Sequence, residues 1–289
     1  MANLKDIRLR IDSTKNTQQI TKAMKLVSAA KLRKAQNNIQ NMRPYALTLK
    51  QVIANIAATQ KVSHPLMATK PNVKNVLLIV LTSDRGLAGA FNSGINKFAE
   101  KYHADHKSKV NIDFIFIGKR GADFFARKNI KGIETFTKLE KDISYALASS
   151  IAESVVQHFL SDKYDEVRMI YNEFKSAISQ KVTCETLLPI EVDMSDAASL
   201  TKFNADMIFD PSPEKIIEEL LKKNFNLQLY RAMSESVASE HGARMTAMEN
   251  SSNNARDMIS KLTLTYNKAR QEKITTELTE IVSGAESLK

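Results

Sequence analysis

The eight residues at 83–90 include glycine and polar residues of the kinds that can bind phosphate. They read Ser-Asp-Arg-Gly-Leu-Ala-Gly-Ala and follow a strongly apolar run at 76–82. A glycine-bearing loop between a strand and a helix can hold phosphate on its backbone N–H groups. The glycine spacing matches neither the dinucleotide-binding nor the P-loop fingerprint, so it favours a tight turn from strand to helix, with an interaction loop as the alternative. The residues that define this turn are Asp84, Arg85, Gly86 and Gly89.

No other pattern indicates catalysis or a metal site. The five histidines are scattered along the chain. His103 and His106 lie three apart without a further ligand pattern, which favours a solvated helix surface over metal binding. The single cysteine, Cys184, excludes an internal disulfide and falls in a strand-like run, where we expect a buried structural thiol. The chain is therefore expected to carry no catalytic residue, no metal and no cofactor.

Long helices are predicted at both ends of the chain. The first 43 residues contain neither proline nor glycine. The last 77 residues contain no proline after the first of them, Pro213, and only two glycines. We expect one helix over about residues 4–58, with a kink near Pro44, and a second that begins at Pro213 behind the capping residue Ser212.

Each long helix has an apolar stripe at helical spacing. On the first helix the stripe fades across the polar residues 12–19, and its positions are Leu4, Ile7, Ile11, Ile20, Met24, Val27, Leu32, Ile39, Met42, Leu49, Val52 or Ile53, and Ile56. On the last helix, an initial step of four from position 237 to 241 is followed by alternating steps of four and three to position 269, and a five-residue step then leads to Ile274, Leu278 and Ile281. Alternating steps of this kind predict a coiled-coil seam.

The middle of the chain is predicted to be an α/β domain. Strands are expected at 76–82, 110–117, 133–137, 167–172 and 180–188, and helices at 91–106, 119–128 and 142–160. Strands that alternate with helices predict a Rossmann-like, mainly parallel sheet with helices on its faces, and the two successive strands at the end predict an antiparallel edge pair. Residues 191–210 are expected to form a connector.

The two long helices are expected to pack together as an antiparallel coiled coil, into which the α/β domain is inserted. The first helix runs toward the α/β domain and the last one runs away from it, so a packed pair must be antiparallel. Because the last helix is longer by about 17 residues, its end should project as a single helix. The predicted division is 1–58 for the N-terminal coiled-coil helix, 73–210 for the globular domain and 211–289 for the C-terminal coiled-coil helix.

The basic charge is concentrated in the first helix. Of the net charge of +10, the first 50 residues hold +9, with eleven Lys or Arg against two Asp. This surplus predicts an acidic partner, either nucleic acid or an acidic protein surface. Residues 1–44 contain no aromatic side chain on which bases could stack. The N-terminus lacks an apolar signal segment, and the longest strongly apolar run, Val76–Leu81, is far too short to span a membrane, so we expect a soluble chain.

Three segments resemble the gamma-subunit family of F-type ATP synthases, and the resemblance extends along essentially the whole chain. They are ITKAMKLVSAAKLRKAQ at 20–36, TSDRGLAGAFN at 82–92 and YNKARQEKITTELTEIVSGAES at 266–287. The third contains the family's long C-terminal signature, I-T-x-E-x-x-E-x-x-x-G-A, and is the most specific. Ala88 stands where many members have Cys, and Cys184 alone implies no dithiol switch of the chloroplast type.

The resemblance implies a rotor shaft without an active site of its own. In this family the coiled coil turns inside a ring of three alpha and three beta subunits, and the globular domain joins the epsilon subunit and the membrane ring of c-subunits. Proton flow turns the shaft, whose asymmetric surface takes the beta-subunit sites through their conformations for ATP synthesis. For this chain the family implies membrane contact only through the complex, on the cytoplasmic face of the bacterial inner membrane, and no nucleic-acid partner.

The resemblance also implies particular contact residues. Those matched to coupling contacts with beta-subunit loops are Met24, Lys25, Arg270, Gln271, Thr275 and Glu277. Those matched to an apolar bearing around the tip of the last helix are Ile274, Leu278, Ile281 and Val282. From the residues alone, Met24 is equally a seam residue and Glu277 equally a solvated helix acid.

Two other functions remain as alternatives. A basic coiled-coil protein would bind nucleic acid with a steep salt dependence. A nucleotide-dependent enzyme would bind ATP or NAD at the central sheet, through the turn at 83–90.

Overall fold

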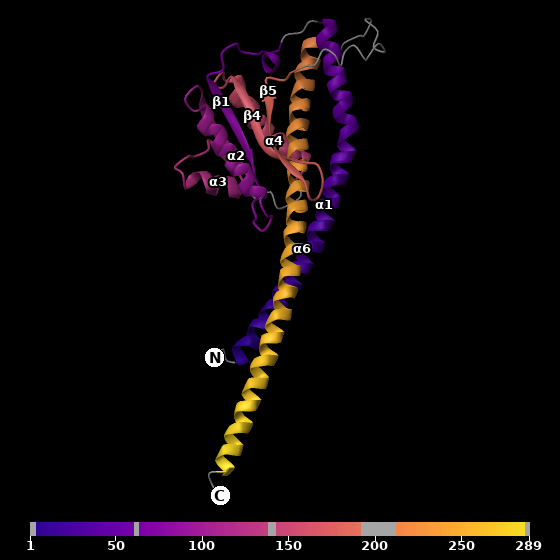
Figure 1. The fold of residues 1–289 in the computed structure, drawn as a ribbon. Coiled ribbons are helices and arrows are strands. Elements are labelled where there is room, and N and C mark those ends of the chain that lie inside the picture. Colours follow the sequence, from indigo (N-terminus) through magenta and orange to yellow (C-terminus); the bar gives the residue numbers. More distant parts are fainter. Residues whose placement is uncertain (1–3, 61–63, 138–142, 192–211, 287–289) are drawn as a thin grey trace. The chain divides into compact units, whose positions relative to one another are not determined.

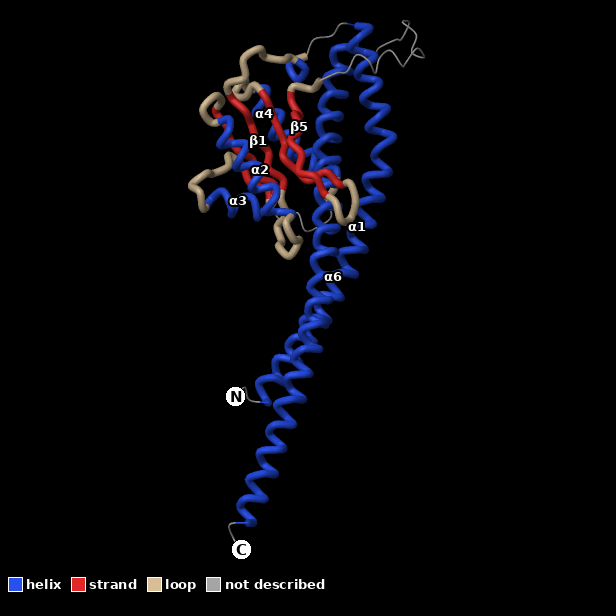
Figure 2. The backbone as a smooth tube through the Cα atoms, viewed as in Figure 1, coloured by secondary structure: helices blue, strands red, loops and turns tan. Residues whose placement is uncertain are grey.

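The computed structural model describes residues 4–60, 64–137, 143–191 and 212–286. In these ranges the elements in chain order are α1 (Leu4–Gln60), the short 3-10 helix η1 (Pro65–Met67), β1 (Asn75–Leu81), α2 (Phe91–His106), β2 (Asn111–Ile117), α3 (Lys119–Ala126), β3 (Glu134–Phe136), α4 (Tyr145–Leu160), β4 (Glu166–Phe174), β5 (Gln180–Leu188) and α6 (Pro213–Glu286). Figure 1 shows them in sequence colours and Figure 2 by secondary structure. Each predicted helix and strand is present. The predicted connector, apart from its first residue, lies outside the described residues.

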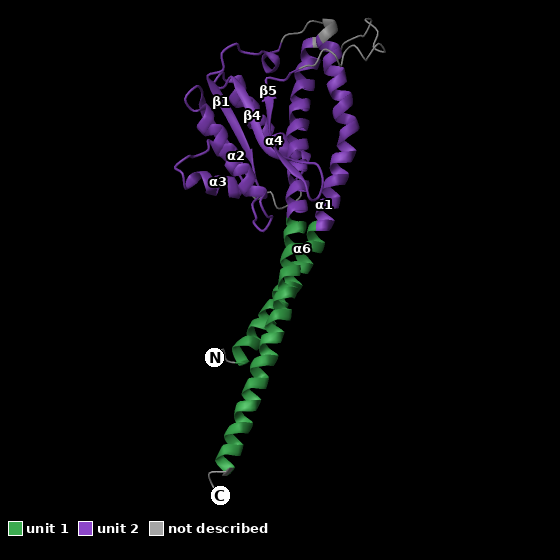
Figure 3. Ribbon diagram, viewed as in Figure 1, with its two compact units in different colours: residues 1–28, 244–289 green, residues 29–243 purple. Residues whose placement is uncertain are grey.

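The chain forms two compact units, which Figure 3 shows in different colours. Unit 1 consists of residues 1–28 and 244–289, and unit 2 consists of residues 29–243. Each long helix contributes a segment to both units, because α1 and α6 each continue across the boundary. α1 is one helix through Pro44, which lies on an exposed face.

Unit 2 contains a five-stranded sheet in the order β3-β2-β1-β4-β5. β1 pairs in parallel with β2 and β4, β2 pairs in parallel with β3, and β5 pairs antiparallel with β4. The mainly parallel sheet and the antiparallel edge pair are therefore confirmed. β1 is the central strand, and its residues 76–81 are buried, which explains their unbroken apolar run.

Helices cover both faces of this sheet. Neighbouring side chains of a strand point to opposite faces, and the apolar core divides accordingly into two clusters. Phe91 of α2 and Phe125 of α3 belong to the cluster on one face. The cluster on the other face combines α4 with the first part of α6, such as Phe225, and the last part of α1, such as Ile53.

The first part of α6 is a core helix rather than half of a two-helix seam. Ser212 caps its start, since the Ser212 hydroxyl accepts a hydrogen bond from the backbone N–H of Lys215 at 3.4 Å, as predicted. Between residues 224 and 239, α6 has buried residues on every side. The predicted seam positions 237 and 241 are half-buried there, without a polar outer face beside them.

Unit 1 is an antiparallel pair of helices, formed by the described residues 4–28 and 244–286 (Figure 3). The predicted α6 seam is confirmed from position 245 to position 269, where each seam residue is buried or half-buried. Met248 and Ala255 are the most deeply buried, at 5% and 7% exposed. From residue 256 to residue 268 the positions between the seam residues are exposed, as expected of a helix with one partner.

The buried stripe of α1 in unit 1 differs from the predicted one. Ile20 and Val27 are 60% and 57% exposed, so their predicted place in the stripe is wrong. The stripe instead keeps its alternating steps of three and four from Ile11 through polar positions, and it buries Thr21 and Ser28. A two-helix seam follows this spacing even where the residues are polar, and small side chains let the two helices approach closely.

Candidate functional site

The turn after β1 leads into α2 and is held by its own polar groups. The backbone N–H of Ser83 donates to Asn92 Oδ1 at 3.0 Å, and the Ser83 hydroxyl donates to the Arg85 carbonyl at 2.6 Å. Asp84 Oδ1 accepts from the backbone N–H of Lys119, the first residue of α3, at 2.8 Å. These bonds join the turn to itself and to its neighbours α2 and α3, which favours the tight-turn interpretation over a phosphate site.

Two residues of this turn have a left-handed backbone. Gly89 has φ 55° and Leu87 has φ 62°. Leucine reaches this region only at a steric cost, so the turn must hold Leu87 there. Its side chain is nevertheless 65% exposed. An exposed leucine on a strained backbone is a candidate contact residue that the sequence pattern does not reveal. At Gly86 a Cβ would lie 3.2 Å from Arg120 Nη2, so the turn also lies close to α3.

The potential metal ligands are packed into the fold rather than gathered around a site. His106 stacks on Tyr102 with ring centroids 4.2 Å apart, and His103 lies against Phe114, where burial lowers the pKa of its imidazole. The expected solvated surface is therefore wrong for both histidines. Cys184 is half-buried on β5, and burial raises the pKa of its thiol. No group of three His, Cys, Asp or Glu side chains that could hold a metal occurs in the described ranges.

Ser154, His158 and Glu134 meet at the edge of the sheet, but not as a catalytic triad. The Ser154 hydroxyl donates to Glu134 Oε1 and Oε2 at 2.7 and 2.8 Å, and His158 Nε2 lies 2.9 Å from Glu134 Oε1. In a triad the imidazole lies between the hydroxyl and the carboxylate and accepts the hydroxyl proton. Here the carboxylate lies between the other two groups, so the cluster joins α4 to β3 and activates no nucleophile.

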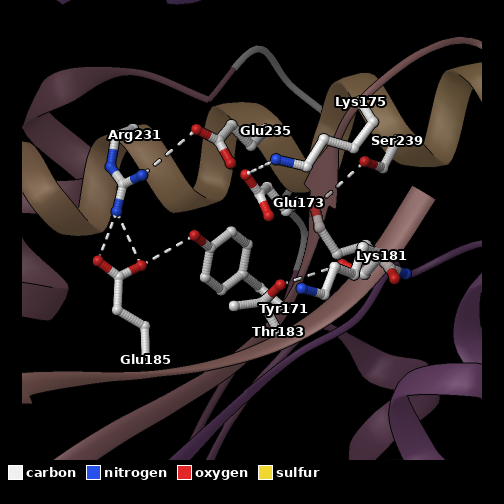
Figure 4. Close-up of polar contacts among 10 residues, drawn as sticks. Tyr171, Glu173, Lys175, Lys181, Thr183, Glu185, Arg231, Glu235 and Ser239 are labelled. Carbon is white, nitrogen blue, oxygen red and sulfur yellow. Dashed lines mark hydrogen bonds and ion pairs between the residues drawn. The ribbon is translucent and has the colours of Figure 1, made fainter. Parts of the chain in front are cut away.

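A second polar cluster joins α6 to the antiparallel pair β4–β5 (Figure 4). Nη2 of Arg231 on α6 lies 2.7 and 2.8 Å from the two carboxylate oxygens of Glu185 on β5. The Tyr171 hydroxyl on β4 donates to Glu185 Oε2 at 2.8 Å. We call Arg231, Glu185 and Tyr171 the polar bridge. Further along α6, the Ser239 hydroxyl donates to the carbonyl of Asn172 at 3.1 Å, so the helix also bonds the β4 backbone.

Glu235 lies beside the polar bridge with one unsatisfied oxygen. Its Oε1 is 3.5 Å from Arg231 Nη1, and its side chain is 14% exposed. Its Oε2 is buried and has no hydrogen-bond partner. Burial raises the pKa of Glu235, and Glu173 and Glu185 raise it further, whereas Arg231 and Lys175 act in the opposite direction. The carboxyl group therefore keeps its proton to a higher pH than an ordinary glutamate.

We expect Glu235→Gln to stabilise the chain at alkaline pH. The pKa of Glu235 is higher in the folded than in the unfolded chain, so its contribution to stability is present at low pH and is lost as pH rises through the folded-state pKa. The variant should match the wild type at about pH 4, below the ordinary glutamate pKa, and exceed it by about 1 kcal/mol at about pH 8.5. Urea unfolding of the full chain at both pH values measures this difference.

Glu219→Gln is the matched control for this prediction. Glu219 lies on the same helix with a side chain that is 75% exposed, and because an exposed ion pair contributes little, its removal should change the free energy of unfolding little. A Glu235→Gln chain that is less stable than the wild type at alkaline pH would mean that the Glu235 carboxylate is adequately paired in the folded state.

The predicted contact residues on α1, Met24 and Lys25, lie within the helix pair of unit 1. Lys25 Nζ is 2.7 Å from Glu249 Oε1, with side chains 36% and 47% exposed. Lys25 thus joins α1 to α6, a role that the sequence analysis did not predict for it. Met24, its neighbour, is half-buried. Contacts of either residue with another subunit stay predictions.

The predicted contact residues on the last part of α6 are all on the surface, since each described residue from 270 to 285 is exposed. The Thr275 hydroxyl donates to the Gln271 carbonyl at 3.0 Å. Glu277 Oε1 lies 3.5 Å from Lys273 Nζ on the same helix, so it forms an exposed ion pair within α6. Arg270 is likewise exposed. The structure places these side chains on one exposed helical segment, where the contacts of Thr275 and Glu277 described above lie within α6.

The predicted bearing residues form an exposed apolar segment near the end of α6. Ile274, Leu278, Ile281 and Val282 are 48%, 57%, 67% and 58% exposed. Large apolar side chains gathered on a surface indicate a binding surface. Among the described residues, no helix is both long enough and apolar enough to cross a membrane.

Comparisons with known proteins agree with this architecture over the whole chain. Residues 3–288 match a protein-family model described as ATP synthase. The chain is 68% identical to the ATP synthase gamma chain of Bdellovibrio bacteriovorus and 45% identical to that of Geobacter sp. (strain M21), each alignment covering 100% of both chains.

Solved structures of mitochondrial ATP synthases are also similar. A chain of the Tetrahymena thermophila central stalk and c-ring structure matches with a TM-score of 0.62 and 28% identity, covering 80% of this chain and 98% of that one. A chain of the Euglena gracilis F1 and c-ring structure matches with a TM-score of 0.69 over 99% of this chain and 94% of that one, at 21% identity, and so supports the fold alone.

Proposed function

Because the chain belongs to the ATP synthase gamma-chain family, we propose that it is the central rotor shaft of an F-type ATP synthase. The single observation that carries this proposal is the 68% identity to a gamma chain over the full length of both proteins. The helix pair of unit 1 supplies the rigid element that a shaft requires. The comparisons support this function, and not the nucleic-acid alternative.

The mechanism that we propose uses the asymmetry of the helices. A pair of helices, or a single helix, cannot present the same surface in three directions, so three surrounding catalytic sites would each meet a different face. A partner shifts a conformational equilibrium only by its difference in affinity for the two states. Rotation of the shaft would thus change the conformation of each site in turn. The chain would supply contact energy and no catalytic group.

The surface of unit 1 supports contacts with a surrounding ring of subunits. Its first helix exposes large apolar side chains on the side away from the seam, namely Leu9, Ile20, Leu26 and Val27, which are 57–66% exposed. These side chains, which the sequence pattern partly assigned to the seam, are instead available to a partner. The surplus of basic residues in the first 50 residues suits acidic loops, and exposed charges allow contacts to form and break at each step.

The partners in this proposal are three alpha and three beta subunits around the helices, and the epsilon subunit and c-ring at the α/β domain. The turn at 83–90, with Leu87 exposed, is a further candidate contact in that assembly. We place the complex on the cytoplasmic face of a bacterial inner membrane, because the most similar relatives described above are bacterial. The chain would contact the membrane only through the complex.

Co-purification tests the proposed function. The chain is expressed with the alpha and beta subunits of its own organism and purified through a tag on the beta subunit. We expect one copy of the chain for three copies of each of the others, with ATP hydrolysis that depends on its presence. Recovery of an active alpha–beta ring without this chain, or failure of the chain to bind the ring, would contradict the proposal.

A pair of threonines tests the proposed contact residues on α6. Thr275 and Thr276 are both exposed, and each donates its hydroxyl to the carbonyl four residues earlier, at 3.0 and 2.9 Å. Only Thr275 is proposed to contact a beta subunit. We expect Thr275→Ala to lower ATP-driven proton pumping by about fivefold, because polar contacts at such an interface contribute about 1 kcal/mol, and Thr276→Ala to leave it unchanged.

Proton pumping is measured in vesicles that contain the complete complex, and unfolding of the free chain gives the stability of each variant. The two variants should be equally stable, since they lose the same local bond. Equal losses of pumping in both variants would show that Thr275 has no contact of its own.

A further inference from the structure

The polar bridge is the directional part of the contact between α6 and the sheet. Around it, α6 packs on the core through apolar side chains such as Leu229 and Met233, which are fully buried. Apolar contact resists separation, but it is not directional and does not by itself define the rotation of a helix about its axis. The contact between Arg231 and Glu185 is directional, because it is a charge-assisted hydrogen bond in which one guanidinium nitrogen, Nη2, lies 2.7 and 2.8 Å from the two carboxylate oxygens.

Stability does not explain why charged groups occupy this position. A half-buried ion pair loses hydration that its attraction only partly restores, and apolar residues of similar size are often as stabilising. The Arg231 and Glu185 side chains are 34% and 33% exposed, so both have lost most of their water. Tyr171 adds a third bond to the same carboxylate, from a hydroxyl buried in β4. Three groups from three elements are thus held in one defined arrangement.

Two other ion pairs on this part of α6 do not join the helix to the sheet. Lys222 pairs with Glu218 and Lys223 with Glu219, in each case four residues apart on the helix itself. Both pairs are largely exposed, and each joins two residues of the helix itself. The polar bridge differs from them because it joins α6 to two strands of the sheet.

We propose that the polar bridge of Arg231, Glu185 and Tyr171 is a torque-bearing joint that makes α6 and the sheet turn as one body. The inference rests on the proposed rotor function and assigns these residues a positioning role in it. When the rotor works against a proton gradient, the load must pass between the sheet and α6. Directional bonds at the contact prevent the helix from rolling or sliding on the sheet under that load.

The test compares loaded and unloaded rotation in the complete ATP synthase reconstituted in vesicles. Arg231→Met with Glu185→Gln removes both charges of the closer pair, while Glu235 loses its ion pair with Arg231. We expect ATP hydrolysis in the presence of an uncoupler, where there is no load, to stay within about twofold of the wild type. ATP-driven proton pumping, where the rotor is loaded, should fall by at least about fivefold.

Lys223→Met is the matched control, since it removes an exposed cation of the same helix whose ion pair, with Glu219, lies within the helix. It should change neither measurement. Tyr171→Phe is the second test variant and decides the matter if the double variant does not assemble, because it removes one hydroxyl and keeps the ring. It should lower the ratio of pumping to hydrolysis in the same direction.

An unchanged ratio of pumping to hydrolysis in these variants would contradict the proposal that the polar bridge bears torque. Equal losses of hydrolysis and pumping would also overturn it, because a general structural defect acts with or without load. Failure of the proposed function itself is distinguishable, since the wild-type chain would then support neither hydrolysis nor pumping.

Discussion

Gly118→Ala is expected to destabilise unit 2 by about 3 kcal/mol or more, because it combines a backbone conformation that other residues avoid with a collision that cannot relax. Gly118 has φ 101°, and a Cβ at this position would lie 2.2 Å from the carbonyl oxygen of Thr82. That carbonyl belongs to the backbone and cannot rotate away as a side chain could. Hydrogen bonds hold the backbone on both sides, from the N–H of Thr82 to the Ile117 carbonyl and from the N–H of Gly118 to the Phe136 carbonyl, both at 2.8 Å.

Urea unfolding of the full chain measures this effect, and Gly284→Ala is its control. Gly284 lies in α6, and a Cβ there would have nothing within 4 Å. Alanine favours a helix over glycine by about 1 kcal/mol, so this variant should be as stable as the wild type or slightly more stable. If Gly118→Ala cost no more than about 1 kcal/mol, the close approach of Gly118 to the Thr82 carbonyl oxygen would be wrong.

Ala255→Glu is expected to separate the two helices of unit 1. Ala255 is 7% exposed in the seam, where its small side chain allows close approach. A glutamate there would have to bury its charge or push the helices apart, at a cost of about 3 kcal/mol. The described residues 4–28 should then lose protection in amide hydrogen exchange, because their partner in unit 1 is the α6 segment.

Asn254→Glu adds the same charge one residue earlier on the exposed side of α6, and it should leave the protection of residues 4–28 unchanged. The two variants have the same net charge, and Asn254→Glu has the higher helix propensity by only about 0.6 kcal/mol, because it keeps Ala255. Equal loss of protection in both would mean that charge, and not the seam, determines the pairing. In the assembled complex, Ala255→Glu should also reduce proton pumping more than Asn254→Glu does.

Much of the local structure could be predicted from the amino-acid order. The scarcity of proline and glycine located both long helices, and the capping hydroxyl of Ser212 located the start of α6, which the structure confirms. The period of the apolar residues distinguished strands from helices in the α/β domain and identified the α6 seam between positions 245 and 269. These features depend on neighbours in the chain, which the sequence displays directly.

Which face of α1 is buried against α6 could be determined only from the tertiary structure. Ile20 and Val27 fit an apolar stripe in the sequence, yet they are exposed, while Thr21 and Ser28 are buried in the seam. The seam follows the spacing that a partner helix imposes, and the apolar residues that it leaves outside are free to bind other subunits. Apolarity alone cannot distinguish a residue that packs within the chain from one that packs on a partner.

The polar bridge shows the same limit for charged residues. Arg231 and Glu235 read as an ordinary charged pair four residues apart on a helix. Only the fold brings Glu185 and Tyr171 from two strands to that side of α6 and leaves Glu235 Oε2 buried without a partner. Helices and caps depend on local bonds, which a sequence encodes within a few residues, whereas burial and ion pairing depend on distant segments that meet only when the chain has folded.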